Sequence, residues 1–90
     1  MAVIYQIAYL EAVTRKHIPN LPVSMKVRIK RAIEERLTVD PVVFGKPLRH
    51  SLKGHRRLRV GDYRIVYRIE EEPACVLIVA IEHRKDVYEA

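Results

Sequence analysis

The sequence predicts a small α+β domain in which two helices pack on one side of a largely antiparallel four-stranded sheet, in the order β-α-α-β-β-β. Three observations lead to this prediction. The chain begins with a segment rich in branched and aromatic residues, and two segments follow in which apolar residues recur at helical spacing. The second half contains three apolar or alternating segments separated by short turns. With 90 residues, the chain can form one hydrophobic core, so we expect residues 1–90 to be a single domain.

The first half of the chain supplies one strand and both helices. Residues 3–9 (VIYQIAY) have the composition of a strand, and residues 10–18 form a short amphipathic segment that Pro19 ends. Pro22 suits the first turn of a second helix, which Asp40-Pro41 ends. Apolar residues on this helix repeat at intervals of three and four: Met25, Ile29, Ala32, Ile33 and Leu37.

The other side of this second helix is rich in lysine and arginine. Lys30–Glu34 and Arg31–Glu35 are spaced as i,i+4 pairs and predict modest ion pairing. A polar helix face is normally solvated, so we predict no function for it.

The second half of the chain predicts a loop, a hairpin and a last strand. Residues 44–54 form a connecting loop, and residues 55–69 (HRRLRVGDYRIVYRI) form a hairpin that turns at Gly61-Asp62. Residues 70–73 are a second turn. Residues 75–81 are apolar without interruption, which predicts a central strand covered on both faces.

A two-residue turn at Gly61-Asp62 fixes how the hairpin pairs, from Val60 opposite Tyr63 to His55 opposite Arg68. One face is then apolar and fit for a core: Leu58, Val60, Tyr63, Ile65 and Tyr67. The other face is positive: His55, Arg57, Arg59, Arg64 and Arg68. Like charges opposite each other destabilise a sheet, so we expect this face to serve a function.

The positive charge of the chain is concentrated in one segment. The chain has 17 Lys and Arg against 11 Asp and Glu, a net charge of +6. Residues 44–68 hold eight of the basic residues and one acid, Asp62, for +7, which leaves nine basic and ten acidic residues, or −1, elsewhere. Clustered charge of this kind indicates phosphate-bearing or acidic partners, with a merely solvated surface as the alternative.

Several other kinds of site have no support in the sequence. The three glycines lie singly and form no phosphate loop, and no Cys/His set has zinc spacing, so no cofactor or metal is predicted. The longest apolar run, residues 76–81, is too short to span a bilayer, and the N-terminus lacks the charged region of a signal peptide. Cys75 is the single cysteine and is expected to be a small buried residue. We expect a cytoplasmic protein.

An arginine cluster, histidines and a C-terminal tyrosine remain as candidates for chemistry. Arg84 follows the last strand and is expected beside the positive face, with Tyr88 four residues further on. Arginine forks suit phosphate oxygens and the charge of a pentavalent transition state, and His83 and Tyr88 can move protons. Such a set could cleave RNA without a metal, with the 2′-hydroxyl as nucleophile. For His83 a catalytic and a surface role are equally compatible with the sequence, and charge alone does not separate RNA binding from cleavage.

Two stretches of the sequence resemble a known family. GKPLRHSLKGHRRLRVGDYRIVYRIEEE and HRKDVY are similar to the RelE/ParE superfamily of toxins from bacterial type II toxin–antitoxin systems, and the likeness in length and element order covers all 90 residues. RelE-like members are ribosome-dependent endoribonucleases that cleave mRNA in the decoding site and inhibit translation. ParE-like members lack the ribonuclease residues and inhibit DNA gyrase. The resemblance implies a cognate antitoxin as partner, a hetero-oligomer formed with it and, in the RelE-like branch, contacts to mRNA and rRNA on the ribosome.

The resemblance also carries over to single positions. The positions that match the functional set of the RelE-like branch are Arg57, Arg64, Arg84 and Tyr88, with His83 as a further catalytic candidate. The RNA-binding candidates are Lys53, His55, Arg56, Arg59 and Arg68. His83-Arg84 and Tyr88 favour the RelE-like branch.

The first hairpin strand departs from the family pattern. The best-known family arrangement has lysines there, whereas this chain has one histidine and three arginines, and arginine stays charged. The general base is therefore open among His55, His83 and Tyr88. The alternatives are a ParE-like gyrase inhibitor without nuclease activity and an inactive member that binds RNA or antitoxin.

Overall fold

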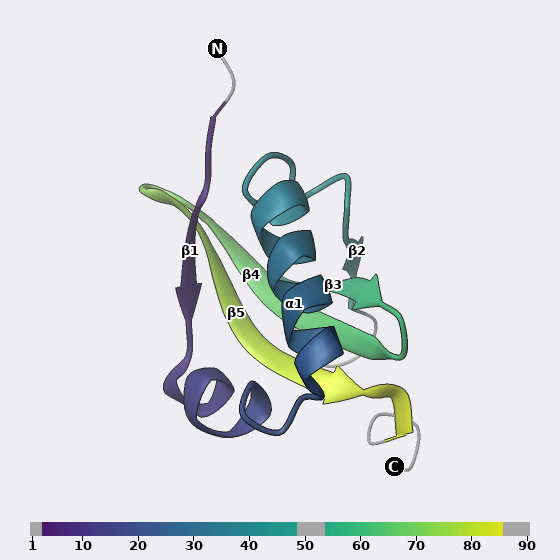
Figure 1. The fold of residues 1–90 in the computed structure, drawn as a ribbon. Coiled ribbons are helices and arrows are strands. Elements are labelled where there is room, and N and C mark those ends of the chain that lie inside the picture. The colour runs from purple at the N-terminus through teal and green to yellow at the C-terminus, as the bar shows by residue number, and fades with distance from the viewer. Residues whose placement is uncertain (1–2, 49–53, 86–90) are drawn as a thin grey trace.

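The computed structural model describes residues 3–48 and 54–85 as one α+β unit with a five-stranded sheet (Figure 1). Along the sheet the strands follow the order β1-β5-β4-β3-β2. β1 runs parallel to β5, and the other neighbours are antiparallel, which confirms the predicted class. The elements are β1 (Gln6–Tyr9), η1 (Val13–His17), α1 (Val23–Ala32), η2 (Ile33–Leu37), β2 (Lys46–Pro47), β3 (His55–Val60), β4 (Tyr63–Glu71) and β5 (Ala74–His83).

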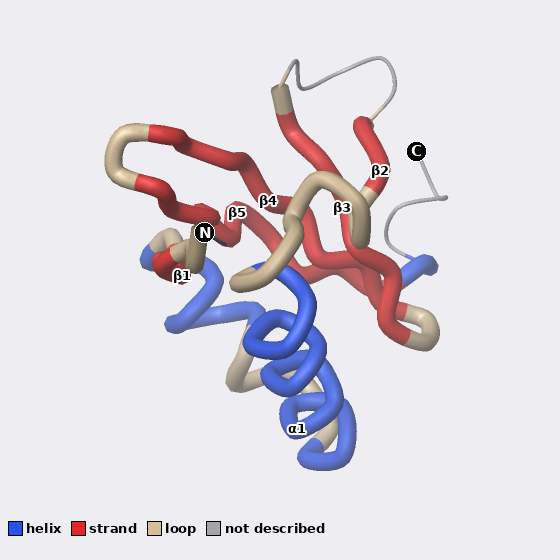
Figure 2. Tube along the Cα trace, turned by 90° about the horizontal axis from the view of Figure 1, so that it is seen from above, coloured by secondary structure: helices blue, strands red, loops and turns tan. Residues whose placement is uncertain are grey.

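The helices η1, α1 and η2 all lie on the same face of the sheet, as Figure 2 shows for the described residues. α1 begins directly after Pro22, where the missing N–H of proline has no helical partner to lose, and it continues into the π-helical turn η2. The short helical segment η1 is fastened to the sheet through His17, whose Nδ1 accepts a hydrogen bond from the backbone N–H of Ile81 at 3.2 Å. No helix in the two described ranges is long and apolar enough to cross a membrane.

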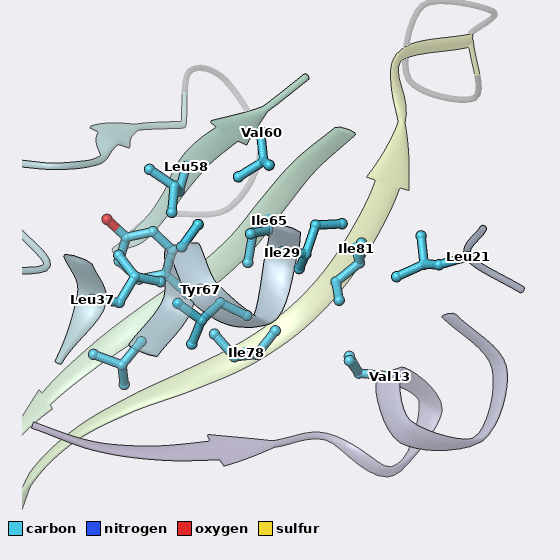
Figure 3. Close-up of a cluster of buried hydrophobic side chains, with 13 residues drawn as sticks. Val13, Leu21, Ile29, Leu37, Leu58, Val60, Ile65, Tyr67, Ile78 and Ile81 are labelled. Carbon is cyan, nitrogen blue, oxygen red and sulfur yellow. The ribbon is translucent and has the colours of Figure 1, made fainter. Parts of the chain in front are cut away.

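The hydrophobic core lies between α1–η2 and the inner face of the sheet (Figure 3). The predicted apolar side of the second helix is buried there, with Ile29, Ile33 and Leu37 almost fully covered. Tyr67 is the largest fully buried side chain, and its hydroxyl donates a hydrogen bond to the carbonyl oxygen of Pro41. Burial raises the pKa of Tyr67 above its ordinary value, although the nearby Arg56 acts in the opposite direction.

The sheet has five strands rather than the predicted four, because part of the segment expected to be a loop pairs with β3. Lys46 lies opposite Arg57, and Pro47 lies opposite Arg56. Proline has no N–H to donate, which limits an edge strand of this kind to a short length. β2 therefore covers only part of β3.

The prediction that the last strand is covered on both faces is wrong. β5 has neighbours on both sides, and Val76, Ile78 and Ile81 are buried under the helices. Residues that face the other way, among them Cys75 and Leu77, are only half-buried because none of the described helices covers that face. The apolar run indicated an interior position in the sheet but not a second covering layer.

The two predicted ion pairs on the second helix are also absent from the described ion pairs. Glu34 and Glu35 lie in η2, where the π-helical winding differs from the 3.6 residues per turn of an α-helix. The i,i+4 spacing counted on the sequence therefore does not bring these carboxylates to Lys30 and Arg31.

Candidate functional site

The β3–β4 hairpin has the predicted register at all six pairs, from Val60 opposite Tyr63 to His55 opposite Arg68. Its inner face packs into the core, and its outer face points away from the helices. We call this outer surface the arginine face: His55, Arg57, Arg59, Arg64 and Arg68. Val66 lies among these residues with 2% of its surface exposed, so the arginine face also contains one buried apolar side chain.

The opposed cations Arg59 and Arg64 avoid each other by turning in different directions. Arg59 Nε donates a long hydrogen bond of 3.5 Å to the carbonyl oxygen of Gly61 in the turn. Arg64 turns to the neighbouring strand β5, where its Nε lies 3.1 Å from Oε1 of Glu82. The repulsion between like charges is thus reduced without giving up the positive face.

Arg57 and Arg68 differ in how their charge is balanced. Arg68 Nη2 pairs with Glu70 Oε1 at 2.9 Å. Arg57 lies opposite Val66 on one side and Lys46 on the other, and no described carboxylate pairs with it. Arg57 is therefore the cation at the centre of the face that is most ready to accept an anion.

Arg84 lies at the turn end of the hairpin, next to the arginine face. Its backbone N–H donates to the carbonyl oxygen of Asp62 at 2.8 Å, and its Nη1 lies 3.6 Å from Oδ1 of the same residue. These two contacts hold the segment after β5 against the β3–β4 turn. The structure thus places Arg64 near the turn end of the arginine face, Arg57 at its centre and Arg84 against the turn itself.

The two candidate site histidines, His55 and His83, lie on different sides of the sheet. His83 lies opposite Tyr63, on the side of the helices, with the two rings in an edge-on contact at 4.9 Å between centroids. Its Nδ1 accepts a hydrogen bond from the backbone N–H of Lys85 at 3.1 Å, and this contact does not use Nε2. His55 belongs to the arginine face, and its Nδ1 is buried without a hydrogen-bond partner among the described residues.

One described site residue, Arg56, does not join this arrangement. Arg56 points to the helix side, where its Nη2 donates to the carbonyl oxygens of Val42 and Gly45 at 2.7 and 3.0 Å. It holds the segment that leads into β2. Lys53 and Tyr88 lie outside the residues that the structure describes.

Glu82 is the site residue that the sequence prediction missed. It lies opposite Arg64 on β5 and is the acid nearest the centre of the arginine face. The signal was present as the acid in Glu82-His83-Arg84, but its place depends on the pairing of β4 with β5, which contains a register shift at Val66/Tyr67. In the described ranges no group of three or more His, Cys, Asp or Glu residues is placed to hold a metal ion.

Comparisons with known proteins define the class to which this fold and site belong. Residues 14–88 match the model of a family described as the ParE toxin of the type II toxin–antitoxin system parDE. The chain belongs to this family and thus to the RelE/ParE superfamily of type II toxins, as the sequence resemblance predicted.

Particular relatives bear RelE-type names. The chain is 35% identical to Toxin RelG of Mycobacterium tuberculosis over 74 residues, which are 82% of this chain and 85% of that protein. It is 32% identical to Toxin RelE of the same organism over 84 residues, covering 93% and 86%. Among solved structures it is similar to the toxin–antitoxin complex RelBE2 of M. tuberculosis, with a TM-score of 0.83, 32% identity and coverage of 91% and 93%. The intact RelBE complex of E. coli has a TM-score of 0.74 at 20% identity over 88% and 95% of the two chains, a likeness in fold.

Proposed function

We propose that this toxin is a metal-independent endoribonuclease that cleaves mRNA on the ribosome and thereby inhibits translation. The observation that carries the proposal is the arginine face itself, which holds Arg57 and Arg64 on neighbouring strands and has Arg84 held against its turn end. The RelE-type names of the relatives from M. tuberculosis support the same branch of the superfamily. Arg59 and Arg68, the remaining arginines of the arginine face, would contact ribosomal RNA.

The chemistry requires no group beyond side chains and the RNA itself. The 2′-oxygen attacks the adjacent phosphorus and gives up its proton to a base, while the bond from phosphorus to the 5′-oxygen breaks and that oxygen takes up a proton. The products are a 2′,3′-cyclic phosphate and a 5′-hydroxyl. Arg64 and Arg84 would stabilise the charge that builds up on the phosphate oxygens, supported by Arg57.

The candidate proton-transfer groups differ in their positions. His55 lies on the arginine face, whereas His83 lies on the Tyr63 side and next to Arg84 in the chain. We propose that His83 reaches the site from the turn end and that Tyr88, which lies outside the described residues, assists proton transfer. His55 is the alternative general base.

A second candidate function is the inhibition of DNA gyrase without nuclease activity. The name of the matching family, ParE toxin, favours it. Against it stand His83-Arg84 and Tyr88, which match the RelE-like branch of the superfamily. An inactive member that only binds RNA or antitoxin would keep the same positive face.

We also propose a cognate antitoxin that binds with acidic side chains near the arginine face. The solved relatives include toxin–antitoxin complexes, which supports such a partner. Charge complementarity would make association fast and dependent on salt. An association rate that is the same at low and high salt would exclude the arginine face from that interface.

Brief expression of the chain in cells without its antitoxin tests the proposed function. We expect growth to stop because translation stops, with mRNAs cut within coding regions. Continued translation together with a DNA damage response and loss of gyrase supercoiling activity would instead assign the ParE-like function. Growth arrest with neither effect would leave a binding function and exclude both enzymatic and gyrase-directed action.

A further inference from the structure

A second group of arginines, from α1–η2, lies next to Arg59 of the arginine face. Arg28, Arg31 and Arg36 from α1–η2 and Arg59 from β3 line a cavity of 390 Å³ that reaches the β3–β4 turn. Glu35 is the one acid in its lining. Four guanidinium groups against one carboxylate give the cavity a net charge of +3. The basic side of this helix, for which no function was predicted, therefore faces a concave surface.

Contacts at the turn show that these cations lack acidic partners. A Cβ atom added to Gly61 would lie 3.5 Å from Nη1 of Arg28, so this guanidinium rests over the turn, and Arg59 Nε contacts the carbonyl oxygen of the same glycine. The carboxylate of Asp62 is engaged by Arg84. Within the described part of the chain, no ion pair involves any of the four arginines of the cavity. An anion in the cavity would relieve their mutual repulsion.

An adjoining cavity of 280 Å³ connects this cluster to the arginine face. Arg36 and Arg59 line both cavities, and Lys46 and Arg57 complete the second one. The two cavities lie along the edge of β3, where β2 pairs with Arg56 and Arg57 and Leu48 with His55, and where no described strand pairs with residues 58–60 on that side. A continuous positive path therefore runs from Arg57 round this edge to α1.

An exposed aromatic ring identifies the ligand that suits this path. Phe44 lines the second cavity among the cations and is 46% exposed. Aromatic rings set within a positive groove are the combination that binds single-stranded nucleic acid, because bases stack on the ring while phosphates contact the cations. An acidic protein segment would use the arginines but would gain less from an exposed ring.

We propose that these two cavities form one edge groove that binds a single strand of RNA outside the cleavage site. The edge groove consists of Arg28, Arg31, Arg36, Phe44, Lys46 and Arg59. The arginines bind backbone phosphates, and Phe44 stacks on a base. The choice of RNA as ligand rests on the proposed function, but strand binding in the groove does not require that the chain cleave RNA.

Equilibrium binding of a non-cleavable RNA tests the edge groove. The probe is a fluorescent, fully 2′-O-methylated single strand of about 12 nucleotides, titrated by anisotropy with the antitoxin-free chain at several salt concentrations. For the double variant R28A/R31A, loss of two phosphate contacts should lower the slope of log K against log salt by about 1.4 and weaken binding about 25-fold at 0.1 M salt. The control K26A/K30A removes two charges from the same helix, at side chains that line a different, apolar cavity, and should bind like the parent.

Phe44→Leu separates stacking from charge. Loss of one stacked base should weaken binding about fivefold or more while the salt slope stays unchanged. R28Q/R31Q provides a second charge variant that keeps more of the side-chain bulk, should R28A/R31A melt early.

Parental affinity and slope in both charge variants would overturn the proposal, even if the chain cleaves mRNA. Equal losses in R28A/R31A and K26A/K30A would also overturn it, because only overall charge would then matter. RNA binding that is intact in R28A/R31A while antitoxin binding is lost would assign the groove to an acidic protein. Loss in the groove variants alone supports the edge groove, even if the parent chain proves to have no nuclease activity.

Discussion

Glu82 is predicted to restrain Arg64 in the absence of RNA, and Glu82→Gln tests this role. The substitution keeps the size of the side chain and removes the charge that lies 3.1 Å from Arg64 Nε. Arg64 would then no longer have to leave a carboxylate in order to contact a phosphate. RNA binding should therefore become tighter.

The exposure of the pair sets the size of the effect. The two side chains are 29% and 36% exposed, so solvent screens their attraction, and a net interaction of about 1 kcal/mol is appropriate. Release of Arg64 should thus tighten RNA binding by about fivefold. The free energy of unfolding should fall by no more than about 1 kcal/mol, because the pair contributes to the stability of the β4–β5 pairing.

The assay combines anisotropy titration of the non-cleavable RNA with urea unfolding. Glu70→Gln is the matched control, because Glu70 pairs with Arg68 at the more exposed, distant end of the hairpin and should change RNA affinity less. Weaker RNA binding in Glu82→Gln would show that Glu82 does not restrain Arg64. Unchanged binding together with a complete loss of cleavage would show that Glu82 takes part in proton transfer instead.

Two further substitutions, Tyr67→Phe and Gly45→Ala, test stability by urea unfolding. Their m-values should equal that of the parent, so a change in midpoint reports a change in the free energy of unfolding. Tyr67→Phe should cost about 1–3 kcal/mol, because the buried carbonyl oxygen of Pro41 loses its donor; an unchanged midpoint would mean that water replaces the hydroxyl. The pKa of Tyr67 is raised above 10.0 in the folded state, so the neutral hydroxyl contributes to the free energy of unfolding below pH 10.0. This contribution is lost as the pH rises from 10.0 through the folded-state pKa. Tyr67→Phe should therefore lose less stability than the parent in alkali. Gly45→Ala should cost about 1–3 kcal/mol, since a Cβ there would lie 1.8 Å from the Tyr67 hydroxyl and 2.9 Å from the Arg57 carbonyl oxygen; parental stability would contradict this packing.

The sequence predicted those features that depend on local rules. The two-residue turn at Gly61-Asp62 and the alternation of apolar residues determined the register of the hairpin, and all six pairs were confirmed. The spacing of Ile29, Ile33 and Leu37 likewise identified the buried side of the second helix. These features follow from neighbours in the chain.

Other features depend on contacts between distant segments. Glu82 meets Arg64 only because β5 pairs with β4 across a register shift, which no short pattern reports. The basic side of α1 gained a possible function only when packing placed it beside Arg59 and the open edge of β3. The opposed arginines looked unfavourable in sequence because the turning of Arg64 toward β5 could not be seen.

The central claim is that the arginine face cleaves RNA by stabilising charge on the phosphate. The most direct measurement maps the ends of an mRNA in a translating extract to which the parent chain, Arg64→Ala or Arg84→Ala has been added. Each protein is added with and without prior treatment by a metal chelator. We expect 2′,3′-cyclic phosphate and 5′-hydroxyl ends, and a cleavage rate about a hundred to a thousand times lower in each variant than in the parent. Cleavage by the parent should survive the chelator once magnesium is restored for the ribosome. Full activity in both variants, or ends of another chemistry, would contradict it.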